Sequence, residues 1–280
     1  MLCAALHRVA ALGCADHEPP IAFILDAADA EWLGVKAKLY VVAASHPCFA
    51  VKRAMELKGI AYDRVEWPPT LHVPLQRLRF AKGTVPGLTL DGEKVIGSRT
   101  IMHRLDDLQP EPTLYPSDPN ARRRVEDADR WGEEVLQALA RRMTWWTLRR
   151  RPRAITTYGE DSRLPLPDFA AVATAPLITR IEWVINDVSD EIIKGDLRAL
   201  PGHLDRVDAW IAEGTLAGQT PNAADLQIGS SIALLNTQRD LRPLLDGRPS
   251  REVALREFSD FPGHMPEGTL PRKWIPATVA

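Results

Sequence analysis

The sequence predicts an α/β domain followed by a longer domain built from helices. Short apolar runs alternate with helix-like stretches between residues 38 and 110. From residue 120 onward, apolar residues recur mainly at helical spacing. A chain of 280 residues with 45% hydrophobic residues is long enough to build two such domains around a sizeable core.

The α/β domain is predicted to begin with a strand and a helix. Residues 39–43 form a short apolar run, which is typical of a buried strand. Ser45 follows as a candidate N-cap, and Pro47 suits the first helical turn, where its missing N–H removes no hydrogen bond. Cys48 lies on the inner face of this helix, which Gly59 is expected to end.

Three further strands and two helices complete this domain. Residues 61–67 alternate between polar and apolar side chains, and residues 71–80 form a weaker helical pattern. Asp91 and Gly92 are a strong signal for a hairpin between two short strands. Ser98 is then well placed to cap a helix. The resulting order, strand-helix-strand-helix-strand-strand-helix, is that of the thioredoxin-like fold.

The second domain is predicted to be helical. Residues 120–142 carry apolar side chains at helical spacing, and further helices are expected over residues 177–193 and 203–212. Residues 152–167 interrupt this pattern because they contain several prolines. The sequence therefore predicts an all-α second domain with one irregular stretch.

A capping box is predicted within the second domain. Asn222 can accept a hydrogen bond from the backbone N–H of Asp225, and the Asp225 carboxylate can reach back to the backbone of Asn222. A carboxylate in the first turn also suits the positive end of the helix dipole. Asp225 is therefore interpreted as a structural residue and not as a catalytic one.

Charge and cysteine content argue against several classes of protein. Lys and Arg together number 35 against 37 for Asp and Glu, so no charge excess indicates nucleic acid or a membrane as partner. Cys3, Cys14 and Cys48 show neither a disulfide pattern nor metal-ligand spacing. We therefore expect a cytoplasmic protein without a metal.

Residues 1–37 are expected to be a weakly ordered extension. The stretch before Cys14 is faintly similar to a lipoprotein signal, but His7 and Arg8 break its apolar run and no positive region precedes it. An export signal is therefore rejected. The remaining boundaries are expected to be a first domain at 38–110, a hinge at 111–118, a helical domain at 119–260 and a tail at 261–280.

Residues 38 to about 232 resemble the cytosolic glutathione transferase superfamily. The resemblance rests on several short motifs that occur in the family's order and spacing. They are Leu39-Tyr40 in the first strand, Ser45 at the strand-to-helix turn, residues 51–62, Gly83-Thr84-Val85-Pro86, Gly97-Ser98-Arg99-Thr100-Ile101, Leu114-Tyr115-Pro116, and the capping box, where Asn222 replaces the family's usual Ser or Thr.

The resemblance implies that glutathione binds in an extended form against the first domain. Backbone groups of Val85, before a cis Pro86, would pair with the thiol peptide as an added strand. Ser98 and its helix N-terminus would hold a carboxylate, with Arg99 as a further basic contact. Ser45 would donate to the sulfur and favour its thiolate, which then attacks a hydrophobic electrophile. The family also implies a homodimer.

Each candidate residue has a second interpretation. Ser45 and Ser98 can each be only the N-cap of a helix, and His46 an exposed residue at a helix start. Cys48 stands where dithiol proteins of this fold carry their second cysteine, but the first cysteine is absent here, so Cys48 is interpreted as a buried apolar residue. Gly97 stands where the family often has an acidic or amide residue, which removes one side chain from the predicted thiol site.

Three classes of function remain open. The first is a transferase that conjugates glutathione, or another low-molecular-weight thiol, to hydrophobic electrophiles. The second is a related thiol-dependent isomerase, dehalogenase or reductase, and the third is a non-catalytic binding or scaffold protein. Trp145 and Trp146 are either core residues or, as the resemblance implies, part of the wall of the substrate site.

Overall fold

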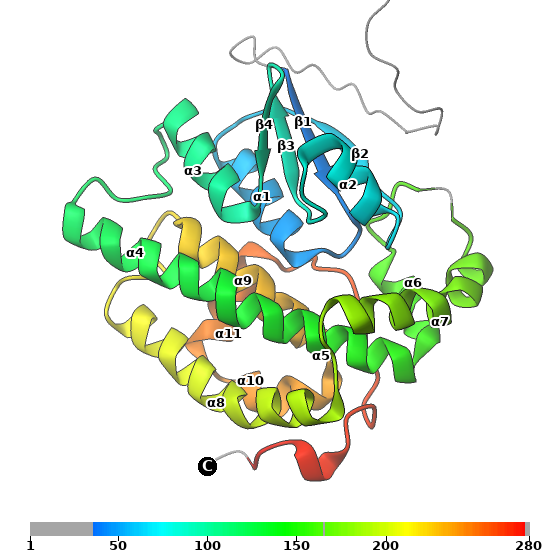
Figure 1. The fold of residues 1–280 in the computed structure, drawn as a ribbon. Coiled ribbons are helices and arrows are strands. Elements are labelled where there is room, and N and C mark those ends of the chain that lie inside the picture. Colours follow the sequence, from blue (N-terminus) through cyan, green and yellow to red (C-terminus); the bar gives the residue numbers. More distant parts are fainter. Residues whose placement is uncertain (1–35, 165, 278–280) are drawn as a thin grey trace, which may run out of the picture.

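Four strands form one mixed sheet in the first domain of the computed structural model, which describes residues 36–164 and 166–277 (Figure 1). The strand order is β2-β1-β3-β4, with β1 and β2 parallel and the other neighbouring pairs antiparallel. The strands are β1 (Ala37–Val41), β2 (Asp63–Glu66), β3 (Gly87–Leu90) and β4 (Glu93–Ile96). The expectations for residues 1–35, Cys3 and Cys14 lie outside the described residues.

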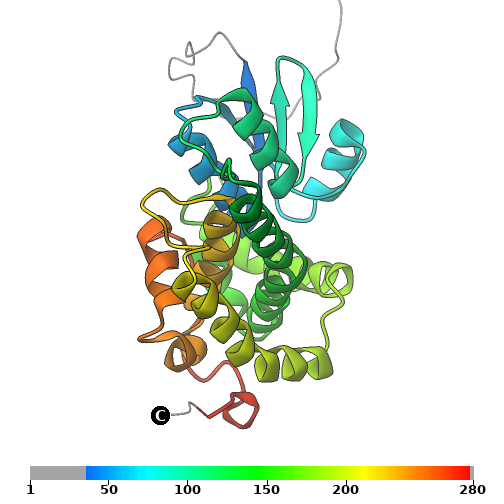
Figure 2. The same ribbon diagram turned by 90° about the vertical axis from the view of Figure 1, so that its left-hand side faces the viewer.

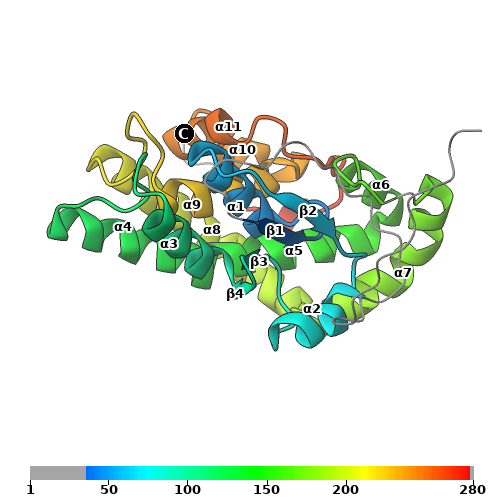
Figure 3. The ribbon, with the colours of Figure 1, turned by 90° about the horizontal axis from the view of Figure 1, so that it is seen from above.

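Three helices cover the two faces of this sheet. They are α1 (His46–Leu57), α2 (His72–Phe80) and α3 (Ser98–Leu108). The helices α1 and α3 pack together on one face, and α2 lies on the other (Figures 1 and 3). The predicted order of strands and helices is confirmed, and the domain has the thioredoxin-like fold.

The alternation of side chains along the strands produces two separate cores. Leu39 and Leu88 are fully buried in the large core that continues into the second domain. Tyr40 points to the opposite face, where its ring lies 5.8 Å from that of Trp67 and 5.1 Å from that of Phe80 on α2. Gly87 allows this close approach, because a Cβ there would lie 2.7 Å from the Phe80 ring.

The second domain is helical and lies beneath the sheet domain (Figure 2). Short 3₁₀ turns lie at Pro152–Ala154, Arg239–Leu241 and Arg272–Trp274. The helices are α4 (Pro119–Trp131), a π-helical segment (Gly132–Leu136), α5 (Gln137–Arg150), α6 (Ile155–Tyr158), α7 (Asp168–Ile185), α8 (Asp190–Ala212), α9 (Ala223–Asn236), α10 (Arg242–Leu245) and α11 (Pro249–Glu257).

Two helix boundaries differ from the prediction. The uninterrupted helix expected over 120–142 contains the π-helical segment, which begins at Gly132. A Cβ at Gly132 would lie 2.9 Å from Ile228 of α9, so the glycine allows α4 and α9 to pack closely at this point. The helix expected over 177–193 instead ends at Ile185, and Ser189 caps the following helix α8 by accepting from the N–H of Ile192.

The tail is also part of the fold, although its sequence offered no motif. Met265 and Leu270 are buried, and the backbone of Met265 forms an isolated β-bridge with Gln238. Asp240 fixes the chain between these two residues, because its carboxylate accepts from the N–H groups of Gly268, Thr269 and Leu270.

Helix α9 is the buried centre of the molecule. It packs against α1 of the first domain and against α4, α5 and α11 of the second. The predicted capping box at its start is confirmed. Asn222 Oδ1 accepts from the Asp225 N–H at 3.1 Å, and Asp225 Oδ2 accepts from the Asn222 N–H at 3.0 Å. Asp225 Oδ1 also accepts from the N–H of Ala217 at 2.7 Å, so one carboxylate holds two segments of backbone.

Replacing Asp225 is therefore expected to destabilise the whole protein. Asp225→Ala removes a cap and leaves two N–H groups without their acceptor, so we expect the free energy of unfolding to fall by about 2 to 4 kcal/mol. Urea denaturation followed by circular dichroism measures this change. As a control, Glu191→Ala in the first turn of α8, where the side chain is exposed, should change the stability far less. Equal stability of Asp225→Ala and the wild type would contradict the structural role of the capping box.

Candidate functional site

A cavity of about 510 Å³ lies between the two domains. The first domain contributes the turn after β1, the start of α2, the loop before β3 and the start of α3. The second domain contributes one face of α5, the segment around α6, and α7. Figure 3 shows α2 and α7 on the same side of the molecule. Ser45, Val85 and Ser98 all line this cavity, whereas Pro86 and Arg99 are not among its lining residues.

The turn that carries Ser45 is held in a constrained conformation. Ala44 adopts φ +53°, in the left-handed region that non-glycine residues rarely occupy. The Ser45 N–H donates to the carbonyl of Val42, and the Ser45 carbonyl accepts from the N–H of Cys48. Ser45 occupies the N-cap position of α1, but its side chain makes no capping hydrogen bond. Its hydroxyl therefore does not cap α1, although it hydrogen-bonds the thiol of Cys48 in that helix.

Cys48 and His46 are both buried beneath this turn. Cys48 is 1% exposed, and burial raises the pKa of its thiol to about 11, while hydrogen bonding from Ser45 lowers that pKa by less. The expected burial of Cys48 is thus observed, but the expected exposure of His46 is wrong. His46 is 3% exposed, and burial together with the Arg141 charge holds its pKa well below the usual range. His46 is the first residue of α1 and hydrogen-bonds the backbone of Gln137 in α5.

The peptide bond between Val85 and Pro86 is cis, as predicted. Gln76 of α2 positions the loop before it, because its fully buried amide donates to the Thr84 carbonyl at 3.0 Å. On the other side, the Pro86 carbonyl accepts from the Gly97 N–H. Between these two contacts, the N–H and C=O of Val85 have no hydrogen-bond partner among the described residues. An open backbone edge of this kind can pair with an extended peptide.

The start of α3 differs in one detail from the prediction. Gly97, at φ +93°, occupies the N-cap position, and Ser98 is the first residue of the helix and not its cap. The interpretation of Ser98 as only an N-cap is therefore wrong. Ser98 is 2% exposed and lines the cavity at the positive end of the helix dipole.

Arg99 links the two domains. Its Nε donates to Asp129 Oδ2 of α4 at 3.2 Å, and the same oxygen accepts from the Tyr115 hydroxyl at 2.9 Å. Asp129 is fully buried, and burial raises the pKa of its carboxyl to about 6, although Tyr115 and Arg99 both lower that pKa. Since Arg99 is held by this network, its predicted contact with a ligand is not supported by its position.

The second domain supplies the apolar wall of the cavity. Thr144, Trp145 and Leu148 of α5 line it together. The neighbouring Trp146 turns into the core, where it is fully buried and its indole N–H donates to Asp190. Trp145 is therefore part of the cavity wall, and Trp146 is a core residue. Further apolar lining comes from residues to which the sequence analysis gave no role in a site. In the second domain they are Ile155, Leu164, Leu166, Ile178, Ile185 and Leu234, and in the first domain Pro47 and Val73.

Polar contacts attach the segment after α6 to the edge of the sheet. Glu66, at the end of β2, accepts from the Ser162 hydroxyl at 2.5 Å and from the Arg163 N–H at 2.9 Å. Arg64 donates to Glu66 and to Asp161. Because Glu66 and Ser162 both line the cavity, these bonds hold the two domains together at its rim.

Ionisable side chains also reach the cavity from both domains. Arg141 of α5, Glu182 of α7 and His72 of α2 all line it, as does Glu133 of the π-helical segment. Burial lowers the pKa of His72 to about 4 and raises the pKa of Glu182. Sequence analysis did not identify these residues, because their place at the cavity depends on how the two domains pack together.

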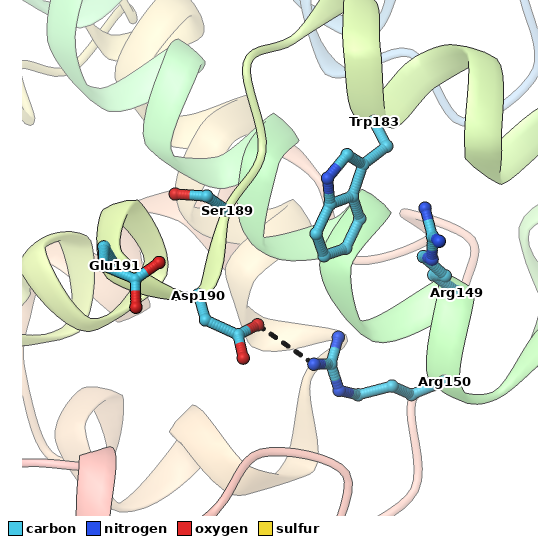
Figure 4. A pocket seen from close by; sticks show the side chains of 6 residues that line it. All are labelled: Arg149, Arg150, Trp183, Ser189, Asp190 and Glu191. Atoms are coloured by element: carbon cyan, nitrogen blue, oxygen red, sulfur yellow. Dashed lines mark hydrogen bonds and ion pairs between the residues drawn. The ribbon is translucent and has the colours of Figure 1, made fainter.

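A second hollow lies on the outer side of the helical domain and is a poorer candidate for chemistry. Figure 4 shows its six lining residues, with Arg149, Arg150 and Trp183 facing Ser189, Asp190 and Glu191. Arg150 pairs with Asp190 at 3.0 Å, and the Arg149 guanidinium lies 4.6 Å from the centre of the Trp183 ring. Because these charged groups already contact one another, few of them are left to bind a ligand.

The described residues offer neither a metal-binding cluster nor a membrane-spanning helix. Residues 36–164 and 166–277 contain no cluster of three or more His, Cys, Asp or Glu side chains arranged to hold a metal ion. In the same part of the chain, no helix combines the length and apolar character that crossing a membrane requires.

Comparisons with known proteins agree with this geometry. Residues 39–113 match the family model described as glutathione S-transferase, N-terminal domain. No curated protein matches the chain in sequence.

Similar solved structures include a β-etherase from Sphingobium sp. strain SYK-6, with 18% identity, a TM-score of 0.55, and coverage of 79% of this chain and 99% of that one. Glutathione transferase F7 from Populus trichocarpa has 16% identity, a TM-score of 0.54, and coverage of 80% and 93%. A glutathione S-transferase from Rhodospirillum rubrum F11 has 17% identity, a TM-score of 0.53, and coverage of 85% and 99%. At these identities the likeness concerns the fold.

Asp129 is expected to make stability depend on pH. Because its pKa in the folded state is raised, the folded protein binds more protons than the unfolded one between about pH 4 and 6, and stability falls as pH rises through this window. Asp129→Asn does not titrate, so its stability relative to the wild type should increase by about 2 kcal/mol from pH 4 to pH 7. Thermal or urea denaturation at several pH values measures the difference.

Tyr115→Phe provides the control for this prediction. It removes a hydrogen bond that lowers the Asp129 pKa, so the pH window should move upward. A difference between Asp129→Asn and the wild type that stays constant from pH 4 to 7, or that changes in the opposite sense, would contradict the prediction.

Proposed function

We propose that the chain belongs to the cytosolic glutathione transferase superfamily, which its N-terminal domain match and its fold support, and that it activates a low-molecular-weight thiol for attack on a hydrophobic electrophile. One observation carries this proposal. The residues predicted for thiol binding and activation, Ser45, Val85 and Ser98, converge on one cavity whose opposite wall is apolar. A polar half and an apolar half in contact suit a reaction between a thiol peptide and a hydrophobic molecule.

The first domain supports binding of an extended thiol peptide such as glutathione. The N–H and C=O of Val85 offer two backbone hydrogen bonds, as in the addition of a strand to a sheet edge. Ser98 and the first N–H groups of α3 offer a site for a carboxylate, because the helix dipole favours an anion there. Gly97 supplies no side chain to this site, so Ser98 carries more of the binding.

Ser45 is proposed as the residue that activates the thiol. Its hydroxyl makes no capping bond and lies at the N-terminus of α1, so a thiolate beside it gains both a hydrogen bond and the favourable dipole. The thiol loses its proton to solvent, and the thiolate sulfur then forms a bond to the electrophilic carbon. Where the electrophile carries a leaving group, that group departs with its bonding electron pair.

Cys48 is a poor candidate for the nucleophile. Its thiol is buried and its pKa is raised, so little thiolate forms near neutral pH. This observation disfavours a reductase that uses the protein's own cysteine. A thiol-dependent isomerase or dehalogenase uses the same bound thiol and remains within the proposal, as does glutathione or another thiol as cosubstrate. A cytoplasmic homodimer is proposed from the superfamily alone.

A non-catalytic binding protein is the second candidate, and the missing side chain at Gly97 favours it. Such a protein would bind a thiol or a hydrophobic ligand in the same cavity without accelerating conjugation. Measured turnover of wild-type protein with an aryl halide separates the two candidates.

Ser98→Ala is expected to weaken binding of glutathione by about 1 to 3 kcal/mol, because it removes a hydrogen bond to a charged group. Isothermal titration calorimetry measures this loss. Thr100→Ala, two residues further on the exposed side of α3, is the matched control and should bind glutathione like the wild type. Unchanged affinity in Ser98→Ala would remove Ser98 from the thiol site.

Ser45→Ala is expected to slow conjugation of 1-chloro-2,4-dinitrobenzene by about 10- to 1000-fold, equivalent to about 1.4 to 4 kcal/mol of activation free energy. Cys48→Ala should change that rate by only a few-fold, because the buried thiol takes no part. Steady-state kinetics with glutathione measures both variants. An inactive Cys48→Ala protein, together with a mixed disulfide on Cys48 in the wild type, would overturn the assignment and indicate a thiol-transfer enzyme.

A further inference from the structure

Arg141 places a positive charge in the wall of the cavity that is otherwise largely apolar. It lies one helical turn before Trp145, so that α5 presents Arg141, Trp145 and Leu148 to the same space. Its Nη2 donates to Gln137 Oε1 at 2.8 Å. Among the described residues, no carboxylate forms an ion pair with Arg141, and its Nε and Nη1 have no hydrogen-bond acceptor.

A guanidinium in this position destabilises the folded protein unless an anion or hydrogen-bond acceptors pair with it. Burial lowers the pKa of Arg141, yet an arginine side chain stays protonated in proteins. Transfer of a charge from water into a protein is unfavourable without an opposite charge or hydrogen bonds. The neighbouring arginine on the same helix illustrates the usual solution, because Arg142 donates to both carboxylate oxygens of Asp196 at 2.8 and 2.9 Å.

Among the described residues, the other ionisable groups that act on Arg141 form no ion pair with it, although the charge of Glu182 raises its pKa. Burial, and to a smaller extent the Arg141 charge, lowers the pKa values of both His46 and His72, so neither imidazole adds a charge near neutral pH. Glu182 is attracted to Arg141, but its Oε2 accepts from the Asn186 amide at 2.9 Å and its Oε1 has no partner. The positive charge of the cavity is therefore concentrated on Arg141.

We infer that Arg141 binds an anionic group of the electrophilic substrate, so that the cavity accepts small hydrophobic electrophiles that carry a carboxylate or a similar planar anion. Guanidinium groups suit such anions because their N–H donors match two acceptor oxygens. This inference rests on the proposed function in assigning the anion to the electrophile. It deepens that proposal by naming the substrate class.

The position of Arg141 favours the electrophile over the thiol as the source of the anion. Arg141 belongs to the second domain and shares its helix face with Trp145 and Leu148. The backbone edge at Val85 and the helix N-terminus at Ser98 belong to the first domain and offer their own polar contacts to a thiol peptide. An electrophile seated on the apolar wall would therefore meet Arg141 at its polar end.

Equilibrium binding tests the inference without any reaction. The ligands are 3,5-dinitrobenzoate and 3,5-dinitrobenzamide, which have nearly the same shape and differ in charge. By calorimetry, the wild type should bind the benzoate about 10- to 100-fold more tightly than the benzamide, the range of a hydrogen-bonded charge pair. Arg141→Met should lose this preference and bind the benzamide as the wild type does. Arg149→Met, an exposed arginine on the same helix, should keep it.

Two further variants sharpen the test. Arg141→Lys keeps the charge but not the planar donor geometry, so it should retain part of the preference. Glu182→Gln removes the competing negative charge and should tighten benzoate binding several-fold. Glutathione added first should not displace the benzoate if the two ligands occupy different halves of the cavity.

Several outcomes would overturn the inference. The wild type could bind benzoate and benzamide equally, or bind neither ligand. Folded Arg141→Met could keep the full preference for the benzoate. Glutathione could also displace the benzoate completely. If Arg141→Met fails to fold, Arg141→Lys and Glu182→Gln decide the matter, and no change of preference in either would count against it.

A conjugation assay tests the proposed function separately from the anion site. In 4-chloro-3,5-dinitrobenzoate the thiolate sulfur would bond to the chlorine-bearing carbon and chloride would leave with its electron pair. The wild type should prefer this substrate over its amide through a lower KM, and Arg141→Met should abolish that difference. A preference in binding without any conjugation would leave the anion site in place and reject the transferase. Conjugation of both substrates with the same KM would support the transferase and reject the anion site.

Discussion

The packing of α1 against α9 is the contact on which the candidate site depends. Helix α9 is buried along almost its whole length, and its capping box fixes where it starts relative to the preceding backbone. Because α1 lies on α9, the N-terminal end of α1 is held at the boundary between the two domains. The turn with Ser45 can therefore face the second domain without belonging to a flexible loop. The arrangement makes the inter-domain cavity a consequence of core packing.

Burial shapes the electrostatics of this cavity in a consistent way. It raises the pKa values of Cys48 and Glu182 and lowers those of His46 and Arg141, so every one of these groups is shifted toward its neutral form. In such surroundings an anion is stabilised only where fixed donors face it. Helix N-termini at Ser45 and Ser98 and the guanidinium of Arg141 supply those donors at different places.

The sequence predicted the parts of the structure that local patterns determine. The order of strands and helices followed from apolar periodicity, the hairpin from Asp91 and Gly92, and the capping box from Asn222 and Asp225. Boundaries that depend on tertiary contact were predicted less well. The π-helical segment begins where Gly132 meets α9, and no local signal in the sequence reports that contact.

The same distinction applies to the site. Ser45, Val85 and Ser98 lie within two residues of a Gly or Pro that marks a turn or a helix start, so their positions could be inferred. Gln76, Glu66 and Arg141 could not be identified, because their roles arise from partners far away in the sequence or from the lack of one. Arg99 is the converse case. Its position after Ser98 led to a predicted ligand contact, which stays a prediction, whereas the structure shows its Nε paired with a buried carboxylate 30 residues later.

The division of donors between the domains has a consequence for how substrates would lie. In the proposed reaction the thiol sulfur is set by Ser45 of the first domain, while Arg141 of the second fixes the far end of the electrophile. The reacting carbon then lies between two groups whose separation depends on the domain interface. That interface is restrained at the rim by Glu66 with Ser162 and by Arg64 with Asp161. Because orientation of two reactants contributes strongly to rate, these rim contacts are part of the positioning machinery, although none of them needs to touch the reacting atoms.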